Sequence, residues 1–279
     1  MNINKLIDSI EQTAAENVKA ENKDYIQDGL LYCGKCHTAK QCRVSILGKE
    51  RTPYCLCKCE VEKREREAAA LKQQEFERKI RNMRRMGFPE AEMQKWTFEA
   101  DDGANAEVTK VMKSYVNNFA TFKEIGKGLL LYGNVGTGKT FAAACVANAL
   151  IDKGYPCLMT NFARLRNTLN GMYDGKQEYI DGLSRFSLLI IDDLASEADT
   201  EYMGEVVQNI IDSRYRSGLP IIITTNLTGE ELRRPADMRK QRIYSRLFDM
   251  TLPLEVKGKD RRKERLKDDF QEYKDLLGM

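Results

Sequence analysis

Short apolar runs alternate with longer amphipathic segments beyond residue 90. The runs are GLLLY (128–132), PCLMT (156–160), SLLIID (187–192) and PIIITT (220–225), with a shorter one, MTLPLE, at 250–255. Nearly continuous apolar runs of this length are typical of strands that are covered on both faces of a parallel sheet. Helical patterns fill the intervening segments 139–153, 162–170 and 199–217. The alternation predicts an α/β fold with a parallel sheet flanked by helices.

The first 90 residues follow a different pattern. Apolar residues recur at helical spacing near the start, forming one stripe that has to dock either on its own domain or on a partner: Ile3, Leu6, Ile7, Ile10, Ala14 and Val18. A cysteine-rich module follows at 25–60, and a highly charged segment at 60–86 predicts a solvated linker helix. Gly87 and Pro89 interrupt that pattern. We therefore predict an N-terminal region at 1–90 and a major domain at 91–279.

Composition narrows the class of protein. The 279 residues include 42% hydrophobic and 31% charged residues, and the net charge is only +3, so any contact with nucleic acid needs a local basic cluster. No apolar stretch approaches the roughly 20 residues that span a bilayer, and the first residues lack the pattern of a signal peptide. We expect a soluble, cytoplasmic protein that does not bind membranes.

The cysteine module predicts a metal site. Six of the eight cysteines lie between Cys33 and Cys59, and in a reducing cytosol such a cluster favours metal binding over disulfides. Four thiolates complete a structural Zn²⁺ site. We favour Cys33, Cys36, Cys57 and Cys59 as ligands, with Cys55 as the alternate and Cys42 and His37 as secondary candidates. An iron–sulfur cluster or reduced thiols are the alternatives. Cys145 and Cys157, in a predicted helix and strand, are expected to be buried in the core.

The segment GNVGTGKT (133–140) matches the phosphate-loop pattern G-x-x-x-x-G-K-[ST] after a predicted strand and before a predicted helix. Glycines let the backbone N–H groups approach phosphate oxygens, Lys139 reaches the β and γ phosphates, and the Thr140 hydroxyl is the expected Mg²⁺ ligand. The residues expected to bind the nucleotide are Gly133, Asn134, Val135, Gly136, Thr137, Gly138, Lys139, Thr140 and Phe141.

Polar residues follow two other predicted strands. Asp192 is expected to hold Mg²⁺, and Asp193 to orient or deprotonate the attacking water. Asn226 ends the strand IIITT at the edge where open α/β sheets bind ligands, and it could position that water. Taken alone, either Asp192 or Asp193 could instead lie in a solvated loop after a core strand. Taken alone, Asn226 could be a turn or helix-cap residue.

These motifs resemble the AAA+ ATPases, and among them the DnaC/DnaI-type helicase loaders and the IstB-type transposition helpers. GNVGTGKT, LLIIDDL, TTN and RIYSRLFD (242–249) carry the resemblance, which covers residues 128–265. It implies ATPase activity with ATP and Mg²⁺. It also implies that Arg246 is an arginine finger acting on the ATP of a neighbouring subunit, with Arg242 supporting it. The family's lid arginine corresponds to Arg262, with Arg261 as the alternative. Without the resemblance, all four arginines would read as solvated surface residues.

The resemblance also implies a biological role. DnaI-type loaders carry an N-terminal zinc domain that contacts the helicase, so the chain is expected to bind a DnaB-type replicative helicase and deliver it onto single-stranded DNA, as an ATP-dependent homo-oligomer. An IstB-type helper that assembles on duplex DNA is the alternative, and a zinc-dependent adaptor with a structural nucleotide is a third. By the same resemblance, the helical element at 162–183 is expected to line a channel for single-stranded DNA with cationic and aromatic side chains: Phe162, Arg164, Arg166, Tyr173, Lys176 and Tyr179. The alternative for any one of the aromatic residues is that it packs the helix onto the sheet.

Overall fold

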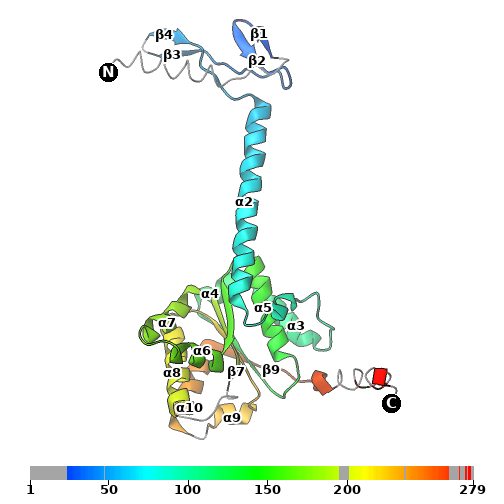
Figure 1. The fold of residues 1–279 in the computed structure, drawn as a ribbon, viewed down its shortest axis with the longest axis vertical. Coiled ribbons are helices and arrows are strands. Elements are labelled where there is room, and N and C mark those ends of the chain that lie inside the picture. The colour runs from blue at the N-terminus through cyan, green and yellow to red at the C-terminus, as the bar shows by residue number, and fades with distance from the viewer. Residues whose placement is uncertain are drawn as a thin grey trace. The chain divides into compact units, whose positions relative to one another are not determined.

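The computed structural model describes residues 24–46, 48–194, 201–235 and 237–263, together with residues 270, 274, 276 and 277. The chain divides into two compact units, Met1–Glu77 and Arg78–Met279, which are described separately (Figure 1). The predicted N-terminal helix and its apolar stripe lie outside the described residues. In the part of the chain that is described, no helix is at once long enough and apolar enough to cross a membrane.

The first unit contains two short antiparallel hairpins and the beginning of a long helix. β1 (Tyr25–Gln27) pairs with β2 (Leu30–Tyr32), and β3 (Val44–Ile46) pairs with β4 (Lys49–Arg51). Strands of three residues carry no readable alternation, so the sequence did not predict them. The linker helix predicted over 60–86 is present as α2 (Lys58–Gly87).

The division between the two units falls within α2, whereas the sequence places the boundary near residue 90. The difference has a physical reason. Ile80 and Met83, in the last turns of α2, pack against the hydrophobic core of the second unit. The helical pattern alone does not reveal which turns of the helix are packed in this way.

The second unit contains a five-stranded parallel sheet in the order β6-β7-β8-β5-β9. Each strand corresponds to one of the apolar runs: β5 (Gly128–Tyr132), β6 (Cys157–Asn161), β7 (Leu188–Leu194), β8 (Ile221–Thr225) and β9 (Thr251–Glu255). β5 lies between β8 and β9 and pairs in parallel with both. The predicted α/β fold with a parallel sheet is therefore confirmed.

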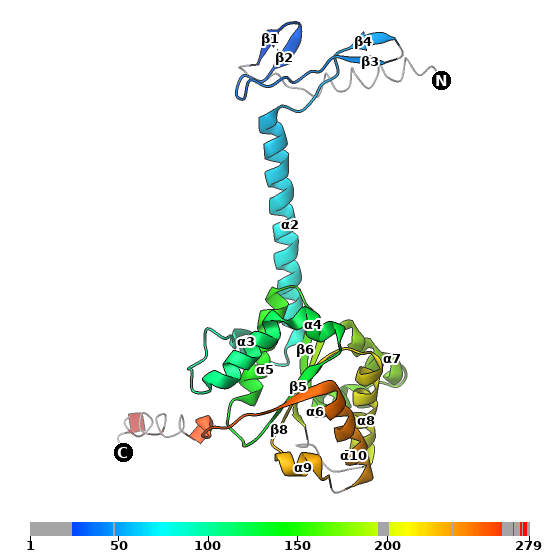
Figure 2. The same ribbon diagram turned by 180° about the vertical axis from the view of Figure 1, so that it is seen from behind.

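Helices cover both faces of this sheet (Figures 1 and 2). Leu129 and Leu131 of β5 belong to one core cluster with α3 (Ala106–Asn117) and α5 (Lys139–Asp152). Leu130 belongs to the other cluster, which includes residues of α6 (Phe162–Asn170), α8 (Glu201–Arg216) and α10 (Met238–Met250). Successive strand side chains point to opposite faces, so a continuous apolar run supplies both clusters.

The remaining elements are short, and the sequence analysis did not predict them. They are the 3₁₀ turns η1 (Ala91–Lys95) and η2 (Leu183–Arg185) and the helices α4 (Phe119–Glu124), α7 (Lys176–Gly182) and α9 (Gly229–Arg233). α3 was not predicted either, although its apolar side chains Val108, Met112, Tyr115 and Val116 are buried on one face.

Candidate functional site

The phosphate-loop segment connects the end of β5 to the first residue of α5. Gly138 precedes the helix with a φ of 91°, and no side chain caps the helix there, so its first N–H groups are available to an anion. Gly133 has a φ of 129°, and a Cβ there would lie 2.8 Å from the carbonyl oxygen of Val256. Both positions therefore require glycine, and the loop is shaped by its backbone.

Lys139 is the first residue of α5 and is only 6% exposed. Its Nζ donates hydrogen bonds to the carbonyl oxygens of Gly133 at 2.8 Å and Asn134 at 2.7 Å. Burial lowers the pKa of Lys139, and the nearby Asp193 and Asp192 oppose this effect. The ammonium group is thus held inside the loop. Because burial disfavours its positive charge, the negative charge of a phosphate group would stabilise it there.

Asp192 lies near the end of β7, where Thr224 of β8 donates a hydrogen bond of 2.6 Å from its hydroxyl to Asp192 Oδ1. Burial raises the pKa of Asp192, while hydrogen bonds from Thr224 and Thr140 lower it. A carboxylate that is costly to keep charged is stabilised by a cation. Asp192 and Thr140 together therefore fit an Mg²⁺ ion, which oxygen ligands prefer.

Asp193 adopts a left-handed backbone conformation with a φ of 61°. The pairing of β7 with β8 shifts its register between Ile191 and Leu194, so Asp193 lies in an irregular part of the strand. Its backbone N–H donates to the Thr224 hydroxyl at 2.9 Å, and its Oδ1 accepts a hydrogen bond of 2.9 Å from Asn226 Nδ2. Strained backbone of this kind is typical of functional sites.

Thr224 was missed by the sequence analysis. Its hydroxyl contacts both acidic residues, because it donates to the Asp192 side chain and accepts from the Asp193 backbone. The available signal was the pair of threonines in IIITT, which places hydroxyl groups in a strand that is otherwise apolar. The structure thus brings the carboxyl ends of β7 and β8 together through one buried hydroxyl.

A single pocket of about 480 Å³ joins the phosphate loop to this acidic end of the sheet. Volumes of this size are typical of small-molecule sites. The predicted residues on its wall run from Val135 to Phe141 and include Asp192, Asp193 and Asn226. Sequence reasoning did not identify four further residues of the wall: Glu90, Met93, Trp96 and Thr224.

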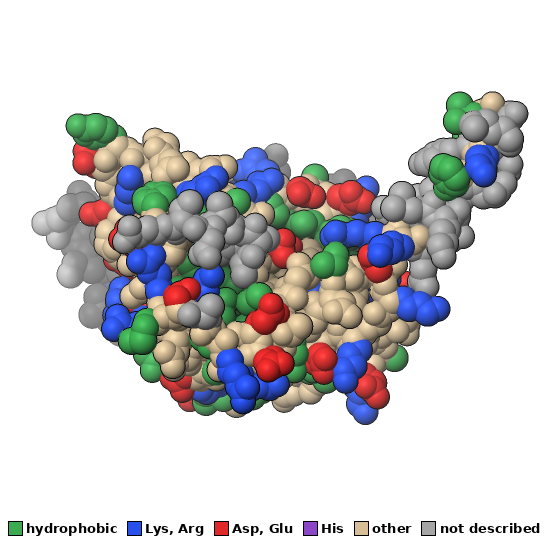
Figure 3. Space-filling view, turned by 90° about the horizontal axis from the view of Figure 1, so that it is seen from below, with side chains coloured by type: hydrophobic (Ala, Val, Ile, Leu, Met, Phe, Trp, Pro, Cys, Tyr) green, Lys and Arg blue, Asp and Glu red, His purple; other side chains and the backbone are tan. Residues whose placement is uncertain are grey.

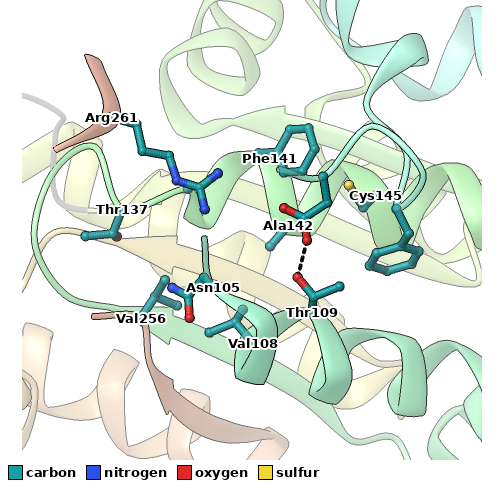
Figure 4. Close-up of a pocket in the computed structure, with 12 residues that line it drawn as sticks. Asn105, Val108, Thr109, Thr137, Phe141, Ala142, Cys145, Val256 and Arg261 are labelled. Carbon is teal, nitrogen blue, oxygen red and sulfur yellow. Dashed lines mark hydrogen bonds between the residues drawn. The ribbon is translucent and has the colours of Figure 1, made fainter. Parts of the chain in front are cut away.

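Both candidate lid arginines, Arg261 and Arg262, also line the pocket. The backbone N–H of Arg261 donates to the Gly136 carbonyl at 3.1 Å, and its guanidinium pairs with Asp102 at 3.3 Å. Figure 4 shows the Arg261 side chain reaching from the chain after β9 toward the phosphate loop. The segment that follows the last strand thus packs directly on the loop.

Arg246 lies on α10 and does not line this pocket. Its Nη1 forms an ion pair with Asp212 of α8. Arg242 is exposed on the same helix and does not line the pocket either. Within one chain, these two arginines are therefore separate from the predicted phosphate and metal ligands.

In the first unit, the sulfur atoms of Cys33, Cys36, Cys57 and Cys59 all lie within 4.8 Å of one another. Cys59 Sγ is 3.4 Å from each of the other three. Hydrogen bonds, the largest from Thr38, lower the pKa of Cys36 to about 5, whereas the three neighbouring thiols raise the pKa of Cys59 to about 12. Thiols this close disfavour a second thiolate unless a cation is present.

The other candidate zinc ligands, Cys55, Cys42 and His37, lie outside this group of four. The Cys55 thiol contacts the Ala39 carbonyl oxygen at 3.4 Å, and Cys42 is exposed. His37 has its Nδ1 3.3 Å from the Tyr25 hydroxyl. Cys145 and Cys157 are each 1% exposed, so both lie in the core as expected.

The predicted DNA-contacting residues divide into two groups. Phe162 is buried at 1% exposure, so the expectation that its ring faces DNA is wrong and the alternative, packing onto the sheet, holds. Tyr179 is partly buried and packs against the same core cluster. Tyr173 is 97% exposed, and Arg164 and Lys176 are exposed, while Arg166 is half-buried. On the face shown in Figure 3, basic and acidic side chains intermingle.

The sequence is similar to those of two replicative helicase loaders. The replicative helicase loader DnaI of Bacillus subtilis (strain 168) is 29% identical over 167 residues, which cover 56% of this chain and 52% of that protein. The replicative helicase loader DnaC of Escherichia coli (strain K12) is 25% identical over 138 residues, covering 48% of this chain and 54% of that protein. The chain spans about half the length of the curated relatives it matches.

Two solved structures are also similar to this chain. A crystal structure of the DnaC helicase loader matches with a TM-score of 0.50 and 25% identity, covering 60% of this chain and 100% of that one. A crystal structure of DnaI matches with a TM-score of 0.51 and 23% identity, covering 61% and 96%, which supports the fold. The model of the IstB-like ATP binding protein family matches residues 61–267, well over half of the chain. The predicted resemblance is confirmed, and the chain belongs to the family of IstB-like ATP binding proteins.

Proposed function

We propose that this chain is an ATP-dependent loader that binds a DnaB-type replicative helicase and delivers it onto single-stranded DNA when replication begins. The observation that carries the proposal is the similarity to the loaders DnaI and DnaC across the part of the chain that contains the ATP site. The cysteine cluster upstream of that part supports it. ATP binding and hydrolysis would switch the chain between holding and releasing the helicase.

In this proposal the phosphate loop binds the ATP phosphates through its backbone N–H groups and the start of α5. Lys139, which now donates to the carbonyl oxygens of Gly133 and Asn134, would donate to the β and γ phosphates. Thr140 and Asp192 would hold Mg²⁺, which neutralises charge on the phosphate oxygens. The pocket that joins these residues is large enough for the nucleotide.

Asp193 and Asn226 would act on the attacking water. The hydrogen bond from Asn226 to Asp193 Oδ1 orients the carboxylate, which would accept a proton from the water. The backbone contact to Thr224 holds Asp193 in its left-handed conformation. A base that is held in this way needs little reorganisation during the reaction.

Arg246 would complete the ATP site of a neighbouring subunit. An arginine finger stabilises the charge that develops on the transferring phosphoryl group. Because Arg246 does not line its own chain's pocket, a role in hydrolysis requires a second copy of the chain. We therefore propose that the active form is a homo-oligomer.

The cysteine cluster would bind one structural Zn²⁺. Four sulfurs at a Zn–S distance of about 2.3 Å lie roughly 3.8 Å apart in a tetrahedron. The sulfur atoms of Cys33, Cys36, Cys57 and Cys59 already lie within 4.8 Å of one another, so the group fits the ion with small adjustments. We propose that the region at 1–90, organised by this ion, contacts the helicase.

Single-stranded DNA would contact the exposed part of the segment from α6 to α7. Tyr173 offers a ring for base stacking, and Arg164 and Lys176 offer positive charge for the phosphates. The net charge of only +3 limits any such contact to a local cluster.

A second candidate is an IstB-type transposition helper that assembles on duplex DNA, because the chain belongs to the family of IstB-like ATP binding proteins. A pull-down of a DnaB-type helicase with the full-length chain, with and without ATP, separates the two. The loader proposal predicts capture of the helicase and loss of capture by Cys59→Ser, with Cys42→Ser as the matched control. Tight ATP-dependent binding to duplex DNA without capture of the helicase would favour the second candidate.

A further inference from the structure

Part of the wall of the nucleotide pocket is made by the 3₁₀ turn η1 and the residue after it. Met93 of η1 and Trp96 line the pocket, as does Glu90 just before η1. The phosphate loop and Asp192 account for the triphosphate and metal end, so this wall is the part of the pocket left for the base and sugar. Nothing in the phosphate loop itself selects between nucleotide bases.

Aromatic rings occupy this wall. The Trp96 ring lies 5.9 Å from the Phe141 ring, centroid to centroid, with an angle of 43° between the planes. Phe141 directly follows Thr140, so its position is fixed by the first turn of α5. The two rings provide an apolar surface beside the phosphate loop, and a purine base can stack on such a surface.

A neighbouring cavity is excluded as the base site. Residues of α3, α5 and the chain after β9 line it, among them Phe141 and Arg261 (Figure 4). Its volume is about 10 Å³, which is near the lower limit for a single water molecule. A purine base does not fit there, so the wall formed by Trp96 is the available one.

Asn148 holds this wall in place. It lies in the middle of α5 and is 1% exposed, although a buried asparagine inside a helix is uncommon. Its Nδ2 donates to the carbonyl oxygens of Met93 and Trp96, each at 2.9 Å, and more weakly to that of Ala144 at 3.2 Å. The Met93 carbonyl also accepts the Trp96 backbone N–H within the turn, so the amide of Asn148 ties both the turn and the residue after it to α5.

The arrangement is specific to an asparagine amide. Asn148 Oδ1 is buried without a hydrogen-bond partner among the described residues, so the side chain is retained for what its nitrogen donates. Leucine or alanine would suit the surrounding apolar core better, but neither could bind two carbonyl groups of η1. Asn148 therefore stabilises the position of η1.

We propose that Asn148 is a positioning residue for base recognition: it fixes η1 so that Trp96, together with Phe141, forms the surface on which the nucleotide base of ATP stacks. This inference rests on the proposed function, because it takes ATP as the ligand. It assigns the base subsite to residues outside the phosphate-loop and carboxylate motifs. The effect of Asn148 on binding passes through Trp96 and leaves the phosphate contacts unchanged.

The chain contains one tryptophan, so Trp96 reports on this subsite without labelling. Its fluorescence is followed in the full-length protein during titration with ATP and, separately, with inorganic tripolyphosphate, which carries the phosphates without the base. We expect ATP to change the emission strongly and tripolyphosphate to change it by less than about a fifth as much. Equal responses to both ligands would overturn the inference.

Isothermal calorimetry with the same ligands tests Asn148. In Asn148→Ala we expect ATP affinity to fall about tenfold while tripolyphosphate affinity stays within about twofold, and Asn167→Ala, on the exposed surface of α6, is the matched control. Equal losses for both ligands, or no loss for ATP, would contradict the positioning role. If Asn148→Ala does not fold, Asn148→Ser takes its place in the same comparison and is held to the same outcomes, while the fluorescence titration of the native chain decides whether Trp96 lies at the base.

The two failures are distinguishable. If calorimetry detects no ATP binding to the native chain, the proposed function fails and the base subsite falls with it. If ATP binds tightly while Trp96 emission responds no more than it does to tripolyphosphate, the base subsite alone is refuted.

Discussion

Asn226 donates a hydrogen bond of 2.9 Å from its side-chain amide to the carboxylate of Asp193, and this contact joins the carboxyl ends of β8 and β7. It predicts how hydrolysis depends on the two residues. Asp193→Asn removes the base and is expected to lower ATP turnover about 100-fold. Asn226→Ala removes only the hydrogen bond that orients the carboxylate, so it is expected to lower ATP turnover about tenfold. Steady-state phosphate release measures both.

ATP affinity should change little in either variant, because neither residue is proposed to hold phosphate or metal. Asp174→Asn, an exposed carboxylate on the loop before α7, is the matched control. A drop in affinity that accounts for the whole loss of turnover would remove Asp193 from the role of base.

The buried position of Asp192 predicts a dependence of stability on pH. Burial raises its pKa above the ordinary value of 3.8, so the folded state holds the proton more tightly than the unfolded state. The free energy of unfolding therefore falls as pH rises from about 3.8 through the raised pKa. At neutral pH, Asp192 is ionised in both states and the folded state has lost all of this stabilisation. Asp192→Asn should raise the melting temperature of the nucleotide-free protein at pH 7 by about 2–4 °C.

This difference should vanish below pH about 3.8, where Asp192 is protonated in both states. It should reverse with ATP and Mg²⁺, because the cation then stabilises the wild-type carboxylate. Calorimetric melting curves at several pH values test the prediction. A variant less stable than the wild type at pH 7 without ligand would contradict it.

The four clustered thiols predict a zinc content of about one ion per chain. Elemental analysis should find this ion in the wild type and in Cys42→Ser, and should find it missing in Cys59→Ser. Cys59 is the informative position because its sulfur lies 3.4 Å from each of the other three. Zinc retained in Cys59→Ser but lost in Cys55→Ser would require a different ligand set.

The separation of Arg246 from the pocket predicts that two inactive variants complement each other. Lys139→Ala lacks its own phosphate ligand but keeps Arg246, and Arg246→Ala keeps a complete pocket. Each alone is expected to have under about 1% of wild-type turnover, given the rate that an arginine finger supplies. An equimolar mixture should recover a measurable fraction of wild-type turnover, whereas a mixture as inactive as its components would place Arg246 outside the reaction.

Most of the sheet and the phosphate site could be predicted from the sequence, because both depend on local patterns. Apolar runs such as LLIID are strands wherever both faces are covered, and GNVGTGKT has one known geometry. Thr224 and Asn148 could not be predicted, since their importance depends on partners in other elements. The Thr224 hydroxyl joins the Asp192 carboxylate to the Asp193 backbone N–H, and the Asn148 amide binds carbonyl groups of η1 and Trp96.

The residues expected to contact DNA show a similar limit of prediction from the sequence. A mixture of aromatic and basic residues does not reveal which rings face solvent, and the structure buries Phe162 while it exposes Tyr173. The helical period places Phe162, Leu165 and Leu169 on one face, and that face packs against the sheet. Periodicity was therefore a better guide to Phe162 than its residue type.

The most direct test of the proposed function is helicase loading onto a closed circle of single-stranded DNA, which offers no end for a ring to thread. A DnaB-type helicase, the chain and ATP are combined with the circle, and helicase retained on it is measured after gel filtration. We predict that the wild type raises retention at least about tenfold and that Lys139→Ala and Cys59→Ser do not. Retention that is the same with and without the chain would contradict the account.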